Sequence, residues 1–114
     1  DGFGEAWKGP DGLIWSAFQG RFTNEDSIEA GTIVPSEATR QCTRIGGTLP
    51  SSVDFENGES TGFREVLPDM KDRWFWSSSF DPRASDGAFG FSANRGKIGY
   101  WHRSLSGAVC CVGR

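Results

Sequence analysis

Histidine and cysteine, the side chains that most often act as a base or a nucleophile, are few in this chain of 114 residues. His102 is the single histidine, and it lies between Trp101 and Arg103 on a predicted strand. The run Ser77–Ser79 has no histidine close to it in the sequence that could activate a hydroxyl group. We therefore expect no enzymatic activity, and we interpret His102 as a surface or interface residue.

The metal-binding side chains are equally sparse. One histidine and three cysteines do not offer the Cys/His spacing of a zinc site. The Glu-Pro-Asn and Trp-Asn-Asp motifs of calcium-dependent lectins do not occur. Asp81, Asp86 and Asn94 supply oxygen atoms in neighbouring predicted loops, which leaves an accidental calcium site open. We expect no resident metal and no cofactor.

The composition indicates one loop-rich, β-containing domain over residues 1–114. Glycine occurs 16 times and aromatic residues make up 13% of the chain, so large rings must supply much of the core. The net charge is −3 with both signs scattered, which argues against nucleic acid as a partner. No apolar run reaches the roughly 18–20 residues of a membrane span. Because the chain begins Asp1-Gly2 rather than with Met, we expect it to be a C-terminal piece of a longer protein.

The segment Arg73–Ser79 predicts the central strand of the core, because aromatic residues favour the pleated surface of a sheet. Side chains alternate along a strand. This places Trp74, Trp76 and Ser78 on one face, and Phe75 and Ser77 on the other. On both faces the side chains are large at the start of the segment and small at its end. This is expected for a strand that is packed on both sides near one end.

The first half of the chain predicts a hairpin and two short helices. Residues 6–8 and 13–16 flank the turn 9–12, and residues 24–31 are acidic and predict an exposed loop around Glu25, Asp26 and Glu29. A helix over 35–45 is predicted with Ser36 as its cap and with Ala38, Cys42 and Ile45 on its buried face. Ser51 and Asp54 have the spacing of a capping box for a second helix containing Val53 and Phe55. Residues 57–61 are predicted to loop out, and residues 63–67 to form a helical turn.

The second half predicts an antiparallel meander. Residues 88–93 and 98–103 flank the turn 94–97 and predict a hairpin, and residues 108–112 predict a final strand. The order of hairpin, two helices and meander is typical of the α+β class.

Several landmarks together resemble a known family. They are Asp11–Ser16, a cysteine on a helix, Gly47–Ser51, Trp76–Ser79 and a terminal Val109–Val112. The chain from about Gly9 onward resembles the C-terminal domain family of the Legionella collagen-like adhesin, whose members are C-type-lectin-like. It is similar in particular to the tip domains that predatory bacteria carry on trimeric surface fibres. The resemblance implies a C-type-lectin-like fold, a homotrimer and display outside the cell.

Three cysteines in an oxidised protein imply one bridge and one leftover thiol. The family pattern pairs the helix cysteine with the cysteine of a terminal Val-Arg-Cys-Val, which implies a Cys42–Cys111 disulfide here. Cys110 then stands where the family has an arginine. A bridge of that span would stabilise the fold by about 4 kcal/mol, while a vicinal Cys110–Cys111 bridge remains the alternative.

A binding surface is the remaining functional candidate, because loops on a rigid sheet commonly carry recognition. Aromatic, cationic and amide groups are expected to gather there for ring stacking and for hydrogen bonds to a sugar. The candidate ligand-binding residues are Arg83, Asn94, Arg95, Lys97, Trp101, His102 and Arg103. The alternative is that they are solvated loop residues, with Trp101 in the core.

The leading hypothesis is a non-enzymatic adhesin tip that binds a glycan or another surface polymer of a host or prey cell. A homotrimer would add avidity to weak single sites. The alternatives are a structural trimerisation or capping domain without its own ligand, and a degenerate enzyme-like domain that depends on a free thiol at Cys110.

Overall fold

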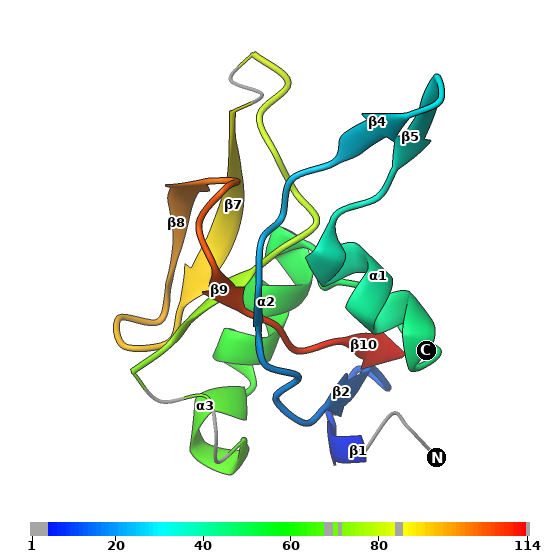
Figure 1. Cartoon of the computed structure of the whole chain (residues 1–114). Coiled ribbons are helices and arrows are strands. Elements are labelled where there is room, and N and C mark those ends of the chain that lie inside the picture. The colour runs from blue at the N-terminus through cyan, green and yellow to red at the C-terminus, as the bar shows by residue number, and fades with distance from the viewer. Residues whose placement is uncertain (1–4, 68–69, 71, 84–85, 114) are drawn as a thin grey trace.

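A computed structural model describes residues 5–67, 70, 72–83 and 86–113 (Figure 1). It shows an α+β domain with three helices and several small sheets in this part of the chain, which confirms the predicted class. Among the described residues, no helix combines the length and the apolar character needed to cross a membrane.

The larger sheet has five strands in the order β3-β9-β6-β7-β8. The strands are β3 (Arg21–Phe22), β9 (Gly107–Ala108), β6 (Trp74–Trp76), β7 (Gly87–Ser92) and β8 (Lys97–His102). The predicted core strand is confirmed as β6, the middle strand of this sheet. The predicted β7–β8 hairpin is also confirmed, with Ser92 paired to Lys97 and Gly87 paired to His102.

The predicted meander and final strand need correction. Only β6, β7 and β8 follow one another across the sheet; the chain then returns to the opposite side of β6, where β9 runs parallel to it. The predicted strand 108–112 is divided, because Ala108 ends β9 whereas Val112 begins β10 (Val112–Gly113) in a second sheet. That sheet joins β10 to the predicted N-terminal hairpin of β1 (Glu5–Lys8) and β2 (Ile14–Ser16). Periodicity alone cannot reveal that one apolar run serves two sheets.

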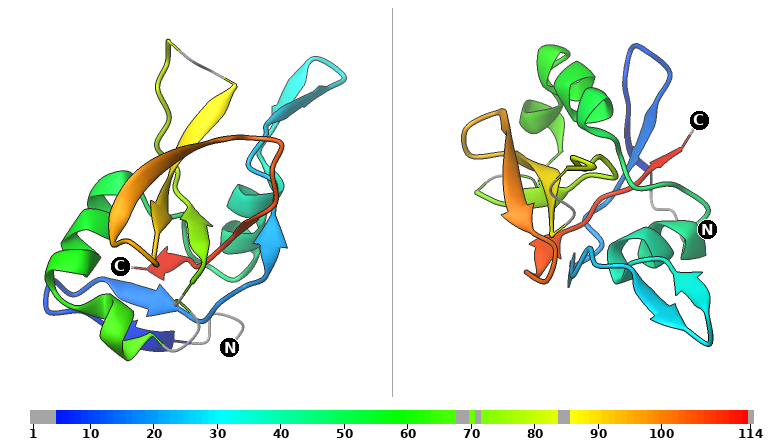
Figure 2. Two further views of the ribbon diagram at one scale, coloured as in Figure 1. Left: turned by 90° about the vertical axis from the view of Figure 1, so that its left-hand side faces the viewer. Right: turned by 90° about the horizontal axis from the view of Figure 1, so that it is seen from above.

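The segment 24–31, predicted as a loop, contains half of a small hairpin. β4 (Ser27–Glu29) pairs with β5 (Thr32–Val34), and Ala30 and Gly31 both have positive φ (52° and 79°) as a two-residue primed turn requires. Figures 1 and 2 show this hairpin projecting from the body of the domain. The acidic composition of this segment predicted a loop, because β4 has no buried face that would mark it as a strand.

The helices follow most of the predicted signals. α1 (Glu37–Arg44) is capped by Ser36 and buries Ala38 and Cys42. α2 (Ser52–Ser60) begins with the predicted capping box, and α3 (Phe63–Val66) is the predicted helical turn. Residues 57–61 do not loop out as predicted, because α2 continues to Ser60. Gly58 is buried there, and a Cβ at this position would lie 2.7 Å from the Phe63 ring, so the glycine lets the ring pack against the helix.

The two faces of the large sheet carry separate apolar cores. Phe75 and Phe91 face the first, which contains Trp15, Phe55 and Phe63 and is covered by α2, α3 and the small sheet. The second contains Trp76, Ala88 and the α1 residues Ala38 and Cys42, with Trp74 and Trp101 packed against it. The predicted division of the Trp and Phe side chains of β6 between two faces is therefore confirmed.

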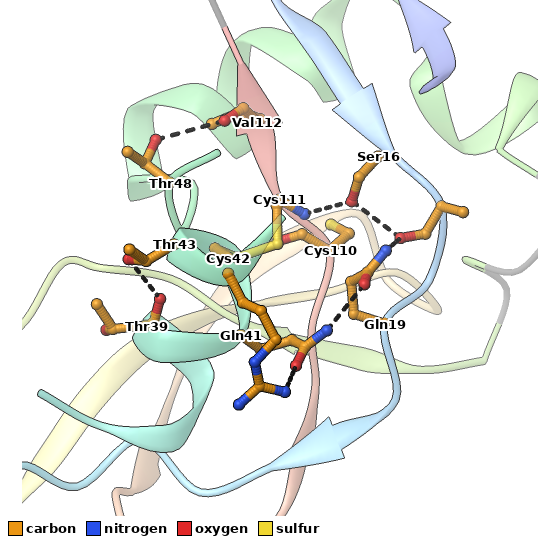
Figure 3. Close-up of a disulfide and its surroundings, with 12 residues drawn as sticks. Ser16, Gln19, Thr39, Gln41, Cys42, Thr43, Thr48, Cys110, Cys111 and Val112 are labelled. Carbon is orange, nitrogen blue, oxygen red and sulfur yellow. Dashed lines mark hydrogen bonds between the residues drawn. A yellow bond between two sulfur atoms is a disulfide. The ribbon is translucent and has the colours of Figure 1, made fainter. Parts of the chain in front are cut away.

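The Cys42–Cys111 pairing is confirmed as a disulfide that ties α1 to the C-terminal segment, with a Cα–Cα distance of 5.4 Å (Figure 3). The bridge spans 69 residues of sequence. Cys110 is the free cysteine and is buried in the first core, where loss of solvation raises the pKa of its thiol far above the ordinary range. The vicinal alternative is excluded.

A substitution of Gly90 tests the aromatic cover of the sheet. A Cβ at Gly90 would lie 2.6 Å from the Phe75 carbonyl oxygen and 2.9 Å from the Trp101 ring. We expect Gly90→Ala to lower the free energy of unfolding by about 1–3 kcal/mol in urea denaturation. Lys97→Ala, at an exposed position on β8, serves as the control and should change it by less than about 0.5 kcal/mol. An unchanged Gly90→Ala would contradict this close packing.

The buried Cys110 thiol predicts a stability that falls with rising pH. In the unfolded chain the thiol ionises near pH 8.5, whereas the folded state keeps it protonated because its pKa is raised. Stability is therefore intact below about pH 8.5 and is lost above it, by up to about 1.4 kcal/mol per pH unit. Denaturation of the non-reduced protein between pH 7.5 and 9.5 should show this slope, and Cys110→Ala should lack it. Parallel pH profiles for the two proteins would contradict the prediction.

Candidate functional site

Six of the seven predicted ligand-binding residues lie along the β7–β8 hairpin or directly after it, and Arg83 lies in the loop before β7. Asn94 and Arg95 lie in the turn of this hairpin, next to Lys97 at the start of β8. His102 and Arg103 lie at the other end, where Gly87 pairs with His102. The two ends are about 17 Å apart, because β7 has six residues and a strand rises about 3.4 Å per residue. The structure therefore does not bring the seven residues into one site.

Trp101 lies between these ends and belongs to the packing of the sheet. Its ring stacks on Trp74, with centroids 4.5 Å apart and planes 12° from parallel. It also covers Gly90 and Gly99, where a Cβ would come within 3 Å of its atoms. These contacts agree with the alternative interpretation, in which Trp101 is a core residue, although Trp101 is partly exposed.

Arg103 holds the root of the β4–β5 hairpin. Its Nε donates to the Asn24 carbonyl at 2.6 Å, and its guanidinium lies 3.4 Å from the Asp26 carboxylate. Asn24 is buried and donates to the Ser77 carbonyl, while its own side-chain oxygen accepts from the Ser36 hydroxyl. This network joins four segments, from the start of α1 to the end of β8. The guanidinium of Arg103 is therefore engaged inside the protein.

His102 and Arg83 are the more exposed members at this end. His102 Nδ1 lies 2.7 Å from the Ser104 hydroxyl, and Arg83 pairs with Asp81 at 3.3 Å. The Arg83 amide and side chain both donate to the Asp81 carboxylate and lower its pKa. These contacts join residues close together in the sequence and order the loop.

One serine, Ser60, lies in a sequence that has the spacing of a catalytic motif. Residues 58–62 have the Gly-x-Ser-x-Gly spacing of a nucleophile elbow, which requires a sharp turn from a strand into a helix. Here the serine, Ser60, is the last residue of α2, and its hydroxyl donates to the Asn57 carbonyl. The spacing therefore occurs without the geometry that exposes a nucleophile.

The candidate calcium ligands are also separated. Asn94 lies at the turn of the β7–β8 hairpin, whereas Asp86 directly precedes β7 at its opposite end. No group of three or more His, Cys, Asp or Glu side chains that could hold a metal occurs among the described residues.

A concavity of about 240 Å³ lies where β3, β6 and β9 meet, and sequence reasoning did not find it. Its lining residues are Arg21, Asp72, Arg73, Trp74 and Ala108. Two arginines, an aspartate and a tryptophan thus border one small space. Ala108 pairs with Arg21 on one side and Phe75 on the other, so the strand pairing brings the two arginine-bearing segments together.

Two features order the rim of this concavity. The Arg73 guanidinium lies 4.1 Å from the centroid of the Phe18 ring, a cation–π contact. Arg21 Nη2 donates to the Ser106 carbonyl at 2.8 Å.

Asp72 has φ of +60°, which is uncommon for a residue other than glycine and is enriched at functional positions. The available sequence signal was Asp72-Arg73 beside the aromatic strand, but nothing local pointed to Arg21.

The other concavities are less suited to a ligand. One of about 80 Å³ is lined by apolar groups including Phe18, Met70 and Phe75, and it reaches Cys110. A second surrounds the Arg64–Glu59 ion pair, in which the Arg64 guanidinium already donates two hydrogen bonds to the Glu59 carboxylate. A third is shallow and hydroxyl-lined, with Thr39, Thr43, Thr48 and Ser51 bonded within the protein.

Arg103 offers a test of whether its role is structural. We expect Arg103→Ala to lower the free energy of unfolding by about 1.5–3 kcal/mol, because the buried Asn24 carbonyl loses a charged donor. Arg83→Ala removes the same charge from a largely exposed ion pair, and its effect should stay below about 0.5 kcal/mol. Chemical denaturation of both variants measures the difference, and equal effects would contradict a structural role for Arg103.

The chain matches no protein-family model, and no curated protein is similar to it in sequence. Its functional interpretation therefore depends on its own chemistry: a disulfide-tied frame, and a concavity bordered by Arg21, Asp72, Arg73 and Trp74.

Proposed function

We propose that this chain is the non-enzymatic recognition domain of an extracellular adhesin, which binds a glycan or another surface polymer of a target cell. The observation that carries this proposal is the concavity between Arg21, Arg73 and Trp74. Sugars are commonly held by an aromatic wall together with planar polar donors and a carboxylate that accepts hydroxyl groups. Residues that carry these groups border the concavity on the five-stranded sheet.

Display outside the cell is supported by the Cys42–Cys111 disulfide. Structural disulfides persist mainly in oxidising environments, and small extracellular domains depend on them for stability. The C-type-lectin-like fold and the position at the tip of a trimeric fibre are the further parts of this proposal. They follow from the resemblance of the sequence motifs, and the α+β architecture is compatible with them.

The alternative is a structural trimerisation or capping domain without its own ligand. The β4–β5 hairpin favours it, because the paired residues Ile28 and Ile33 are 74% and 68% exposed. Paired aliphatic side chains on a projecting ribbon are typical of a protein contact. Both functions are compatible in one molecule, since assembly and ligand binding would use different surfaces.

Light scattering and a glycan array together test the proposal. We expect the purified domain to have the mass of three 12.4 kDa chains with and without reductant, and to bind a subset of arrayed glycans. A trimer that binds nothing on a broad array would support the capping function instead. A monomer that binds glycans would retain recognition but remove the fibre-tip assignment. An oligomer that dissociates only in reductant would show an intermolecular disulfide, and would contradict either the burial of Cys110 or the Cys42–Cys111 pairing within one chain.

A further inference from the structure

We infer that the β4–β5 hairpin of one copy of this chain docks beside α1 of a second copy. This inference specifies the surfaces of the homotrimer in the proposed function and therefore rests on it. Both faces of the hairpin are largely open in the described structure: Ile28 and Ile33 are 74% and 68% exposed, and Ser27, Glu29 and Thr32 are exposed as well. A hairpin of two strands is at best marginally stable in water unless it packs against another surface. The exposed isoleucine pair therefore points to a contact outside the single chain.

The base of the hairpin is fixed at both ends. Asp26 lies directly before β4, and its carboxylate accepts a hydrogen bond at 2.9 Å from the amide of Ser36, which follows β5. The Arg103 guanidinium lies 3.4 Å from the same carboxylate. Figures 1 and 2 show the hairpin projecting from the body of the domain beside α1. The hairpin is therefore presented outward, where a second molecule can reach it.

The charge of the hairpin indicates what kind of surface it fits. Residues 24–36 contain no lysine or arginine. Glu25 and Glu29 are exposed, and neither side chain forms a hydrogen bond or an ion pair with the part of the chain that the structure describes. Like charges that are brought together oppose association, so two of these hairpins are poor partners for each other. The complementary surface has to be cationic.

The exposed side of α1 supplies cations of this kind. Arg40 and Arg44 are both exposed, and their spacing of four residues places them on the same side of the helix. Arg40 Nε donates to the Pro35 carbonyl, and Arg44 Nη1 donates to the Gln41 side chain. Both partners are neutral, and neither arginine pairs with a carboxylate among the described residues. An acidic hairpin from a second copy would supply the missing counter-charges.

A shallow hollow of about 360 Å³ lies along the same helix. Thr39 and Thr43 of α1 line it together with Leu49, and the Thr43 hydroxyl already donates to the Thr39 carbonyl. The Asp54 carboxylate, which also lines the hollow, accepts the Ser51 amide at the start of α2. Small side chains and a leucine suit the exposed isoleucines of the hairpin. An apolar centre with a charged rim is also the usual composition of a protein interface.

The hairpin and α1 are different surfaces, so the contact between copies is head-to-tail. Every copy carries both surfaces and can offer its hairpin to one neighbour and its α1 to another. Such a contact forms a closed ring where the rotation between copies closes, and a filament where it does not. A ring of three copies corresponds to the homotrimer of the proposed function.

Light scattering across a dilution series tests the inference by measuring the dissociation constant of the oligomer. Ile28→Thr and Ile33→Thr together keep β-branched side chains in the strands but remove apolar contact. We expect this double variant to associate at least about tenfold more weakly. Glu29→Lys and Arg44→Glu should each weaken association as well. Combining these two changes in one chain should restore much of the loss, because the charges are then exchanged across the contact.

Val66→Thr is the matched control, because it makes a similar change at an aliphatic residue of α3 that is 48% exposed. It should leave association unchanged, and circular dichroism should show native folding for all variants. An oligomer that persists in the double isoleucine variant would overturn the inference while the homotrimer stands. Failure of Arg44→Glu to weaken association, or of the charge exchange to restore it, would also overturn the inference. A wild-type domain that stays monomeric would overturn both the inference and the homotrimer, and glycan recognition would still stand.

Discussion

The buried C-terminal segment from Val109 to Val112 is the constraint on which the rest of the structure depends. It leaves the large sheet after β9 and enters the small sheet as β10, so it crosses the interior between them. Cys111 fastens it to α1 through the disulfide, and its amide donates to the Ser16 hydroxyl at 2.8 Å (Figure 3). Thr48 pairs with Val112 beside it. One short segment therefore fixes the relative positions of both sheets and a helix.

The aromatic residues stabilise the sheet by covering glycines, and this explains why several prominent rings are unsuited to binding. Trp101 lies on Gly90 and Gly99, while Trp74 lies against Gly107. Glycine weakens a strand because it has no side chain to pack, and a ring laid over it restores the buried contact. The rings thus form a continuous wall on one face. Its edge, at Trp74, borders the concavity beside β3 and β9.

Recognition is consequently expected at the margin of a rigid frame. Strand pairing positions Arg21, and the Phe18 ring positions Arg73. Arg103, in contrast, donates a hydrogen bond to the buried network around Asn24. Buried polar groups must be paired, because an unpaired one costs free energy on folding. An arginine near such a group is therefore a structural partner.

The sequence by itself determined the local elements: the aromatic strand β6, the capped helices, the N-terminal hairpin and the β7–β8 hairpin. These follow from side-chain period, caps and turn residues, which act over a few positions. The tertiary structure alone decided the division of residues 108–112 between two sheets, the exposed β4–β5 hairpin and the meeting of Arg21 with Arg73. It also placed Trp101 and Arg103 in structural contacts. The β4–β5 hairpin is local, but its strands have almost no buried side chains to mark them in the sequence. The others depend on pairing or packing between segments far apart in the chain, for which a single sequence contains no local signal.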